Sequence, residues 1–131
     1  MTDWVIERSR CSPANAFETL KAAIKDDVKA RNALIASGDS SKFTVSRDDS
    51  PRLIVTLEYT IFTEKGPSAI SKSVGIELDG KEIIGTNLQR SFRATLTIDE
   101  NQKCKLKIDG VEYDFWRVRQ MLLEDLFFNI V

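Results

Sequence analysis

The spacing of apolar residues predicts a first long helix that begins after Ser12. A serine side chain accepts a hydrogen bond from an unpaired N–H at a helix start, and Pro13 has no N–H to leave unpaired. Gly38 is the kind of residue that ends a helix. Before this helix, residues 4–8 predict a short strand. The apolar residues at helical spacing are Phe17, Leu20, Ile24, Val28 and either Leu34 or Ile35.

From residue 42 the apolar residues alternate with polar ones, which predicts strands. The longest alternating stretch, residues 53–62, predicts a long strand with one buried side. Shorter strands are expected near residues 43–47, 70–78, 81–85, 92–98 and 104–108. The dipeptides Asp79-Gly80 and Asp109-Gly110 predict tight hairpin turns, because both central positions of the favoured turn have positive φ. The sequences around these two dipeptides resemble each other, and this resemblance follows from the shared turn rule.

The segment from residue 114 to residue 130 returns to helical spacing, with Asp114 as its expected N-cap. Apolar residues cover most of its circumference, and Arg117, Gln120 and Glu124 form a narrow polar stripe. A helix of this kind is buried on more than one side.

This order predicts a single domain over residues 1–131. We expect the α+β class: a two-layer fold in which one face of an antiparallel sheet of about five to six strands carries an N-terminal and a C-terminal helix. The order of strand, helix, strands and helix is similar to the helix-grip architecture of many lipid and hydrophobic-ligand carriers, although this chain and its last helix are shorter. Residues 12–17 resemble the junction between the first strand and the helix in those proteins.

The resemblance implies an apolar cavity between the sheet and the last helix, and the first functional hypothesis is a non-catalytic protein that binds a small apolar ligand there. Ile61 is a further residue of the expected wall. The side chains expected to bind the ligand are Phe17, Leu57, Tyr59, Leu96, Trp116, Leu122 and Phe127.

The apolar end of the last helix favours a second hypothesis. Two adjacent phenylalanines, Phe127 and Phe128, cannot both face one sheet. The alternative function is therefore a protein-interaction module or adaptor that forms a homodimer, or docks a protein partner, through this helix. Both tryptophans, Trp4 and Trp116, are expected to bury their rings near element ends. The expected interface residues are Trp116, Leu123, Phe127, Phe128 and Ile130.

Composition removes several chemistries. The 131 residues include no histidine, which excludes a Ser-His-Asp or Cys-His nucleophile and any histidine-containing metal site in this sequence. An enzyme that uses carboxylate or tyrosine chemistry is the least favoured class. No phosphate loop or dinucleotide fingerprint is present, and we expect no cofactor and no metal. With 19 basic and 20 acidic side chains, nucleic acid is a disfavoured partner. Lys103, Lys105 and Lys107 are interpreted as a solvated strand face.

The remaining expectations concern location and the two cysteines. No apolar run is long enough to span a membrane, and residues 1–4 do not begin a secretory signal. The sequence therefore predicts a cytoplasmic protein. In that compartment Cys11 and Cys104 are expected to be free thiols, with Cys104 as a small buried residue on an apolar strand face. A disulfide between the two remains an open alternative.

Overall fold

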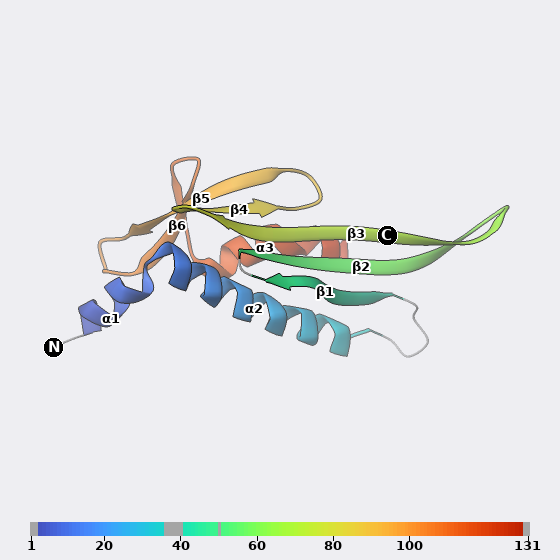
Figure 1. Ribbon diagram of the computed structural model, residues 1–131, viewed down its shortest axis with the longest axis horizontal. Helices are drawn as coiled ribbons and strands as arrows, with labels where there is room; N and C mark the ends of the chain where they lie inside the picture. Colours follow the sequence, from blue (N-terminus) through green and yellow to red (C-terminus); the bar gives the residue numbers. More distant parts are fainter. Residues whose placement is uncertain (1–2, 36–40, 50, 130–131) are drawn as a thin grey trace.

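The computed structural model describes residues 3–35, 41–49 and 51–129 and confirms the α+β class. Two helices precede a sheet of seven strands, and a third helix follows it (Figure 1). The elements are α1 (Asp3–Arg10), α2 (Pro13–Ala33), β1 (Lys42–Asp49), β2 (Arg52–Thr63), β3 (Gly66–Asp79), β4 (Glu82–Thr86), β5 (Ser91–Ile98), β6 (Cys104–Ile108), β7 (Val111–Tyr113) and α3 (Phe115–Phe128).

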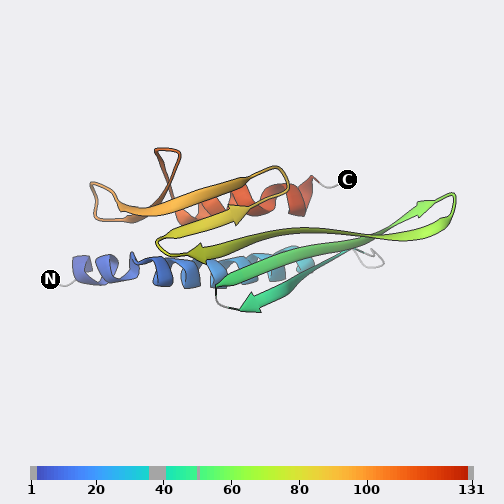
Figure 2. The same ribbon diagram turned by 45° about the horizontal axis from the view of Figure 1, so that its top comes forward.

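The sheet is a meander in which each strand pairs antiparallel with the next along the chain. Helices α2 and α3 run in the same direction (Figures 1 and 2) and share one hydrophobic core with the inward face of the sheet. In β2 the alternating residues Leu53, Val55 and Leu57 are buried in this core, as the pattern predicted. At Gly85 the ring of Phe92 occupies the space of a side chain, so any larger residue there would have to displace that ring.

The start of α2 is confirmed, whereas the strand predicted at residues 4–8 is wrong. The N–H of Asn15 donates to the Ser12 hydroxyl over 3.2 Å, and Pro13 is the first helical residue. Residues 4–8 instead belong to α1, because Trp4, Val5 and Ile6 are consecutive and do not alternate with polar residues. The junction at residues 12–17 therefore joins two helices. Helix α2 ends at Ala33, and Gly38 lies outside the described residues.

The sheet has seven strands where about five to six were expected, because the short β7 pairs with β6 through the Asp109-Gly110 turn. Both of these turn residues have positive φ, at 52° and 80°. In the other Asp-Gly dipeptide the loop begins at the glycine and not at the aspartate. Asp79 still pairs with Glu82, so Gly80, with φ of 62°, takes the first loop position. One dipeptide thus forms two different turns.

Cys11 and Cys104 form a disulfide, so the expectation of free thiols is wrong. Their Cα atoms lie 5.4 Å apart although 93 positions separate them in sequence. Cys104 is half-buried and not enclosed as predicted. The bond ties the junction between α1 and α2 to the first residue of β6, a proximity that only the three-dimensional arrangement creates.

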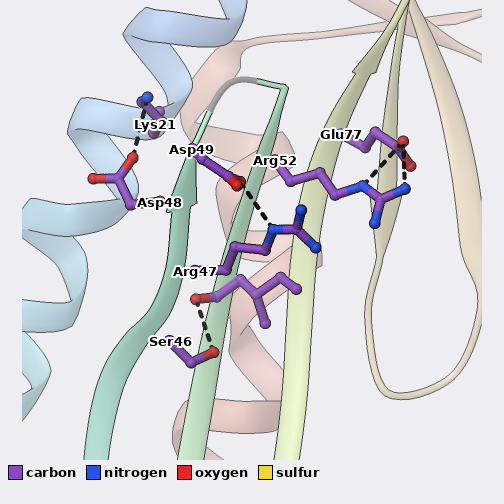
Figure 3. A network of polar contacts seen from close by, with 8 residues as sticks. Lys21, Ser46, Arg47, Asp48, Asp49, Arg52 and Glu77 are labelled. Atoms are coloured by element: carbon purple, nitrogen blue, oxygen red, sulfur yellow. Dashed lines mark hydrogen bonds and ion pairs between the residues drawn. The ribbon is translucent and has the colours of Figure 1, made fainter.

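An ion cluster attaches strand β1 to helix α2 (Figure 3). Asp48 pairs with Lys21, at 3.1 Å, and with Lys25. Within β1 Arg47 pairs with Asp49, and Arg52 of β2 pairs with Glu77 of β3. Hydrogen bonds from Lys25 and then Lys21 lower the pKa of the Asp48 carboxyl below its ordinary value. The hydrogen bond to Asp48 raises the pKa of Lys21.

This cluster predicts an acid-dependent contribution to stability. Because the pKa of Asp48 is lower in the folded state, its contribution is complete above the pKa of the unfolded carboxyl and is lost as pH falls through the folded value. We expect Asp48→Asn to reduce the free energy of unfolding at neutral pH, and the difference from wild type to vanish well below about pH 4. Urea titrations across this range measure the effect. Asp26→Asn, at an exposed position of α2, is the control, and equal losses in the two variants would contradict the prediction.

Strands β2 and β3 extend beyond the rest of the sheet as a two-stranded arm, visible on the right of Figures 1 and 2. Strand β1 pairs with β2 only up to Glu58, and β4 pairs with β3 only from Gly75. Residues 59–63 of β2 and residues 66–74 of β3 therefore lie beyond the pairing with β1 and β4; residues 59–63 pair with 66–70, and residues 71–74 pair with residues 55–58 of β2. We refer to these two stretches as the β2–β3 arm.

Candidate docking groove

A surface groove of about 350 Å³ lies between α2 and α3. It arises because the two helices run in the same direction and turn their most apolar sides toward the sheet. The groove lies along the flank of each helix that the sheet does not cover. Its lining residues are Asp27, Ala30, Arg31, Leu34, Trp116, Arg119, Gln120, Leu123, Glu124, Phe127 and Phe128.

Large apolar side chains stand exposed around the groove. Trp116 is 56% exposed, Phe128 is 61% exposed, and Leu34, the C-cap residue of α2, is 73% exposed. Leu123 and Phe127 are buried and form the apolar floor. Isolated apolar residues are ordinary on a protein surface, but a cluster around a concavity is typical of an interaction site.

Arg31 lies at the end of the groove where both helices terminate, and it contacts residues of both α3 and the sheet. Its Nε donates a hydrogen bond to the backbone carbonyl of Phe127 over 2.9 Å. Its guanidinium carbon lies 5.2 Å from the ring centroid of Phe43 and 5.0 Å from that of Phe128. The cation therefore satisfies a carbonyl in the last turn of α3 and holds the exposed Phe128 ring in place.

An ion pair also connects the two helices. Nε of Arg119 in α3 lies 2.8 Å from a carboxylate oxygen of Asp27 in α2. Along α3 the predicted polar stripe is confirmed, since Gln120 accepts from Arg117 and donates to Glu124. These polar groups satisfy one another, so the apolar side chains offer most of the contact surface for another molecule.

The residues predicted to line a cavity do not gather in one place. Phe17, Leu57 and Leu122 are buried in the common core. Tyr59 and Leu96 are partly buried and pack against that core, whereas Ile61 is 40% exposed on the β2–β3 arm. Trp116 and Phe127 line the groove between the helices.

The residues predicted to form an interface lie closer together. Trp116, Leu123, Phe127 and Phe128 all line the groove, and Ile130 lies outside the described residues. The expectation that both tryptophans are buried is wrong: Trp4 is 60% exposed, similar to Trp116.

The α2 side of the groove was not predicted. Leu34 was one of two residues assigned to the buried helix face, and Ala30 and Arg31 were not singled out. The signal that was available is their spacing: positions 27, 30, 31 and 34 recur at intervals of three and four residues and so share one flank of a helix.

The lysine-bearing strand contains one strongly paired cation. Lys105 contacts Asp99 and Asp114, and the hydrogen bond that it donates to Asp114 is the main cause of its raised pKa. Asp114 occupies the predicted N-cap position of α3, but its side chain makes no cap hydrogen bond. The pKa of Asp99 is lowered chiefly because its carboxylate accepts a hydrogen bond from the N–H of Lys103. Exposed Lys103 and Lys107 complete a strand face that carries charge of both signs.

Comparison with known proteins classifies this chain no further than its fold class. No protein-family model matches the chain, and searches of curated proteins and of solved structures found no significant match. Within residues 3–35, 41–49 and 51–129, no helix is both long and apolar enough to cross a membrane. Those same ranges contain no cluster of three or more cysteine, aspartate or glutamate side chains that could hold a metal ion. The molecule belongs to the two-layer α+β proteins.

Proposed function

We propose that this protein is a protein-interaction domain whose groove between α2 and α3 binds the apolar face of an amphipathic helix. The observation that supports this proposal is the cluster of exposed Trp116, Leu34 and Phe128 around the apolar floor of the groove. Two parallel helices form an elongated concavity, and a helix placed in such a groove inserts apolar side chains at intervals of three and four residues.

The chemistry of the groove suits a protein partner. Tryptophan and arginine are enriched among the residues that contribute most to binding at protein interfaces. The exposed side chain of Trp116 is available for burial by a partner, and the guanidinium of Arg31 lies against the ring of Phe128. The pair of Asp27 and Arg119 satisfies its own charges, so a partner that covers it buries no unpaired ion.

A small apolar ligand is the second candidate, and the volume of the groove favours it. About 350 Å³ falls within the range of roughly 300–1,000 Å³ that is common for small-molecule sites. Such a ligand would occupy the groove between the two helices, whereas the original hypothesis placed it under the sheet among Phe17, Leu57 and Leu122. The exposed rings outside the floor favour the larger protein partner.

The cytoplasmic location predicted from the sequence remains a proposal, and the disulfide is the observation that bears on it. A disulfide between Cys11 and Cys104 is typical of proteins from oxidising compartments, which argues for such a compartment instead. The groove functions in either place, because neither cysteine lines it.

A selection from a library of helical peptides tests the proposed function. We expect the selected peptides to carry large apolar side chains one helical turn apart. Trp116→Ala should weaken their binding at least tenfold, because an aromatic anchor typically contributes about 2 kcal/mol to the free energy of binding. Titration calorimetry with purified wild type and variant measures the change.

Phe62→Ala provides the matched control. Phe62 is 83% exposed and lies on the β2–β3 arm, outside the groove. It should leave peptide affinity unchanged. Unchanged affinity in Trp116→Ala would refute the groove as the docking site, and binding of an apolar dye without any peptide binding would favour the small ligand.

A further inference from the structure

The β2–β3 arm has an unpaired edge within the part of the chain that the structure describes. Along residues 66–74 of β3, no described strand lies on the side that faces away from β2, because β4 begins its pairing at Gly75. A two-stranded ribbon is marginally stable in water, and its free edge presents unpaired backbone groups. Such an edge is a template for another strand.

Other edges of the sheet carry protective features. Strand β1 has an irregularity between Val45 and Arg47 and three charged residues in its last three positions. Strand β7, at the opposite edge, has only three residues. Irregular, charged and short strands discourage pairing between sheets. In the arm, residues 66–71 of β3 carry no charge at all.

For self-pairing centred on Ala69 in β3 or on Ile61 in β2, charge favours the β3 edge of the arm. Antiparallel self-pairing of β3 around Ala69 places Lys72 opposite Gly66 of the other copy, so no like charges meet. The corresponding pairing of β2 around Ile61 places Glu58 opposite Glu64, and these two carboxylates repel each other. Pro67, which lacks an N–H, ends the paired stretch near the tip.

We infer that the free edge of β3 in the β2–β3 arm pairs with the same edge of a second copy of this chain, forming a symmetric dimer with a continuous four-stranded ribbon. A two-fold axis beside Ala69 makes the contact self-complementary. On the inward face Ile70 of one copy lies beside Ser68 of the other, because their positions are equidistant from the axis. Tyr59 and Ile61 flank these residues in β2, so each row across the four strands holds three large side chains and one serine.

Sedimentation of the wild type and two single variants tests this dimer. Ala69→Lys places two lysines opposite each other at the axis, and Thr60→Lys places the same charge at the cross-strand partner of Ala69, on the same face but in β2. Both positions are exposed, so both variants should keep the circular dichroism and melting temperature of a folded chain. We expect a wild-type dimer in the micromolar range, at least tenfold weaker dimerisation in Ala69→Lys, and little change in Thr60→Lys.

A monomeric wild type throughout that range, or a dimer that survives Ala69→Lys, would overturn the inference. Amide hydrogen exchange keeps the test open if a variant loses its fold: in wild type, those amides of residues 68–70 that face the free edge should exchange faster on dilution. Trp116→Ala should leave the dimer intact, because Trp116 lies outside the arm. A dimer that this variant abolishes would place self-association in the groove and contradict the arm.

Discussion

The double variant Cys11→Ala, Cys104→Ala is expected to lose about 2–4 kcal/mol of the free energy of unfolding. The bond joins residues separated by 93 positions, so it restricts a large part of the unfolded chain. It also attaches the start of α2 to β6, two segments that make few other contacts with each other. In the folded state the change removes two half-buried sulfur atoms, so little core packing is lost.

Urea denaturation of the wild type with and without a thiol reductant measures this effect. Because both cysteines are half-buried, a reductant can reach the bond without complete unfolding. Reduction should shift the wild-type midpoint toward that of the double variant, and the double variant itself should be insensitive to reductant. Identical midpoints for oxidised and reduced wild type would show that the disulfide does not stabilise the fold.

Phe17→Ala is expected to cost about 3–5 kcal/mol, because it removes a fully buried ring from the core. Phe17 is 1% exposed and lies one turn after the start of α2. If Phe17 lined a ligand cavity, as the sequence suggested, the change would enlarge an existing space and cost less. The size of the loss therefore distinguishes a core residue from a cavity wall.

Phe62→Ala is the matched control, because it makes the same chemical change at a position that is 83% exposed. We expect a loss within about 0.5 kcal/mol, as for other surface substitutions away from packed contacts. Both variants are compared by urea titration at one protein concentration, with slopes checked for equality. Equal losses at the two positions would contradict the assignment of Phe17 to the core.

Much of the architecture follows from local rules that the sequence displays. Ser12 and Pro13 define the start of α2, and the alternation through Leu53, Val55 and Leu57 defines the buried side of β2. The change from helical to alternating spacing near residue 42 is enough to predict the α+β class. Each of these features depends on residues that are close together in sequence.

Features that depend on distant contacts could not be predicted in the same way. The proximity of Cys11 to Cys104 requires the whole meander to be in place. The Asp-Gly dipeptides illustrate a subtler limit: the same two residues occupy different turn positions, because the pairing of Leu78 with Ile83 and of Ile108 with Val111 sets the register.

The candidate site was predicted on one side only. Trp116, Leu123, Phe127 and Phe128 were identified because α3 has more apolar surface than one sheet can cover. The facing flank of α2, with Arg31 and Leu34, depends on how the two helices pack against each other. Helical spacing shows which residues share a flank but not which flank a second helix approaches.

The central claim is that α2 and α3 form a docking groove, and the nuclear magnetic resonance footprint of a selected helical peptide on the isotope-labelled protein tests it most directly. We expect amide shifts to change along Asp27 to Leu34 and Trp116 to Phe128 and the side-chain N–H signal of Trp116 to move. Signals from the β2–β3 arm should remain in place. Shifts confined to the sheet or the arm, with Trp116 unaffected, would contradict the account.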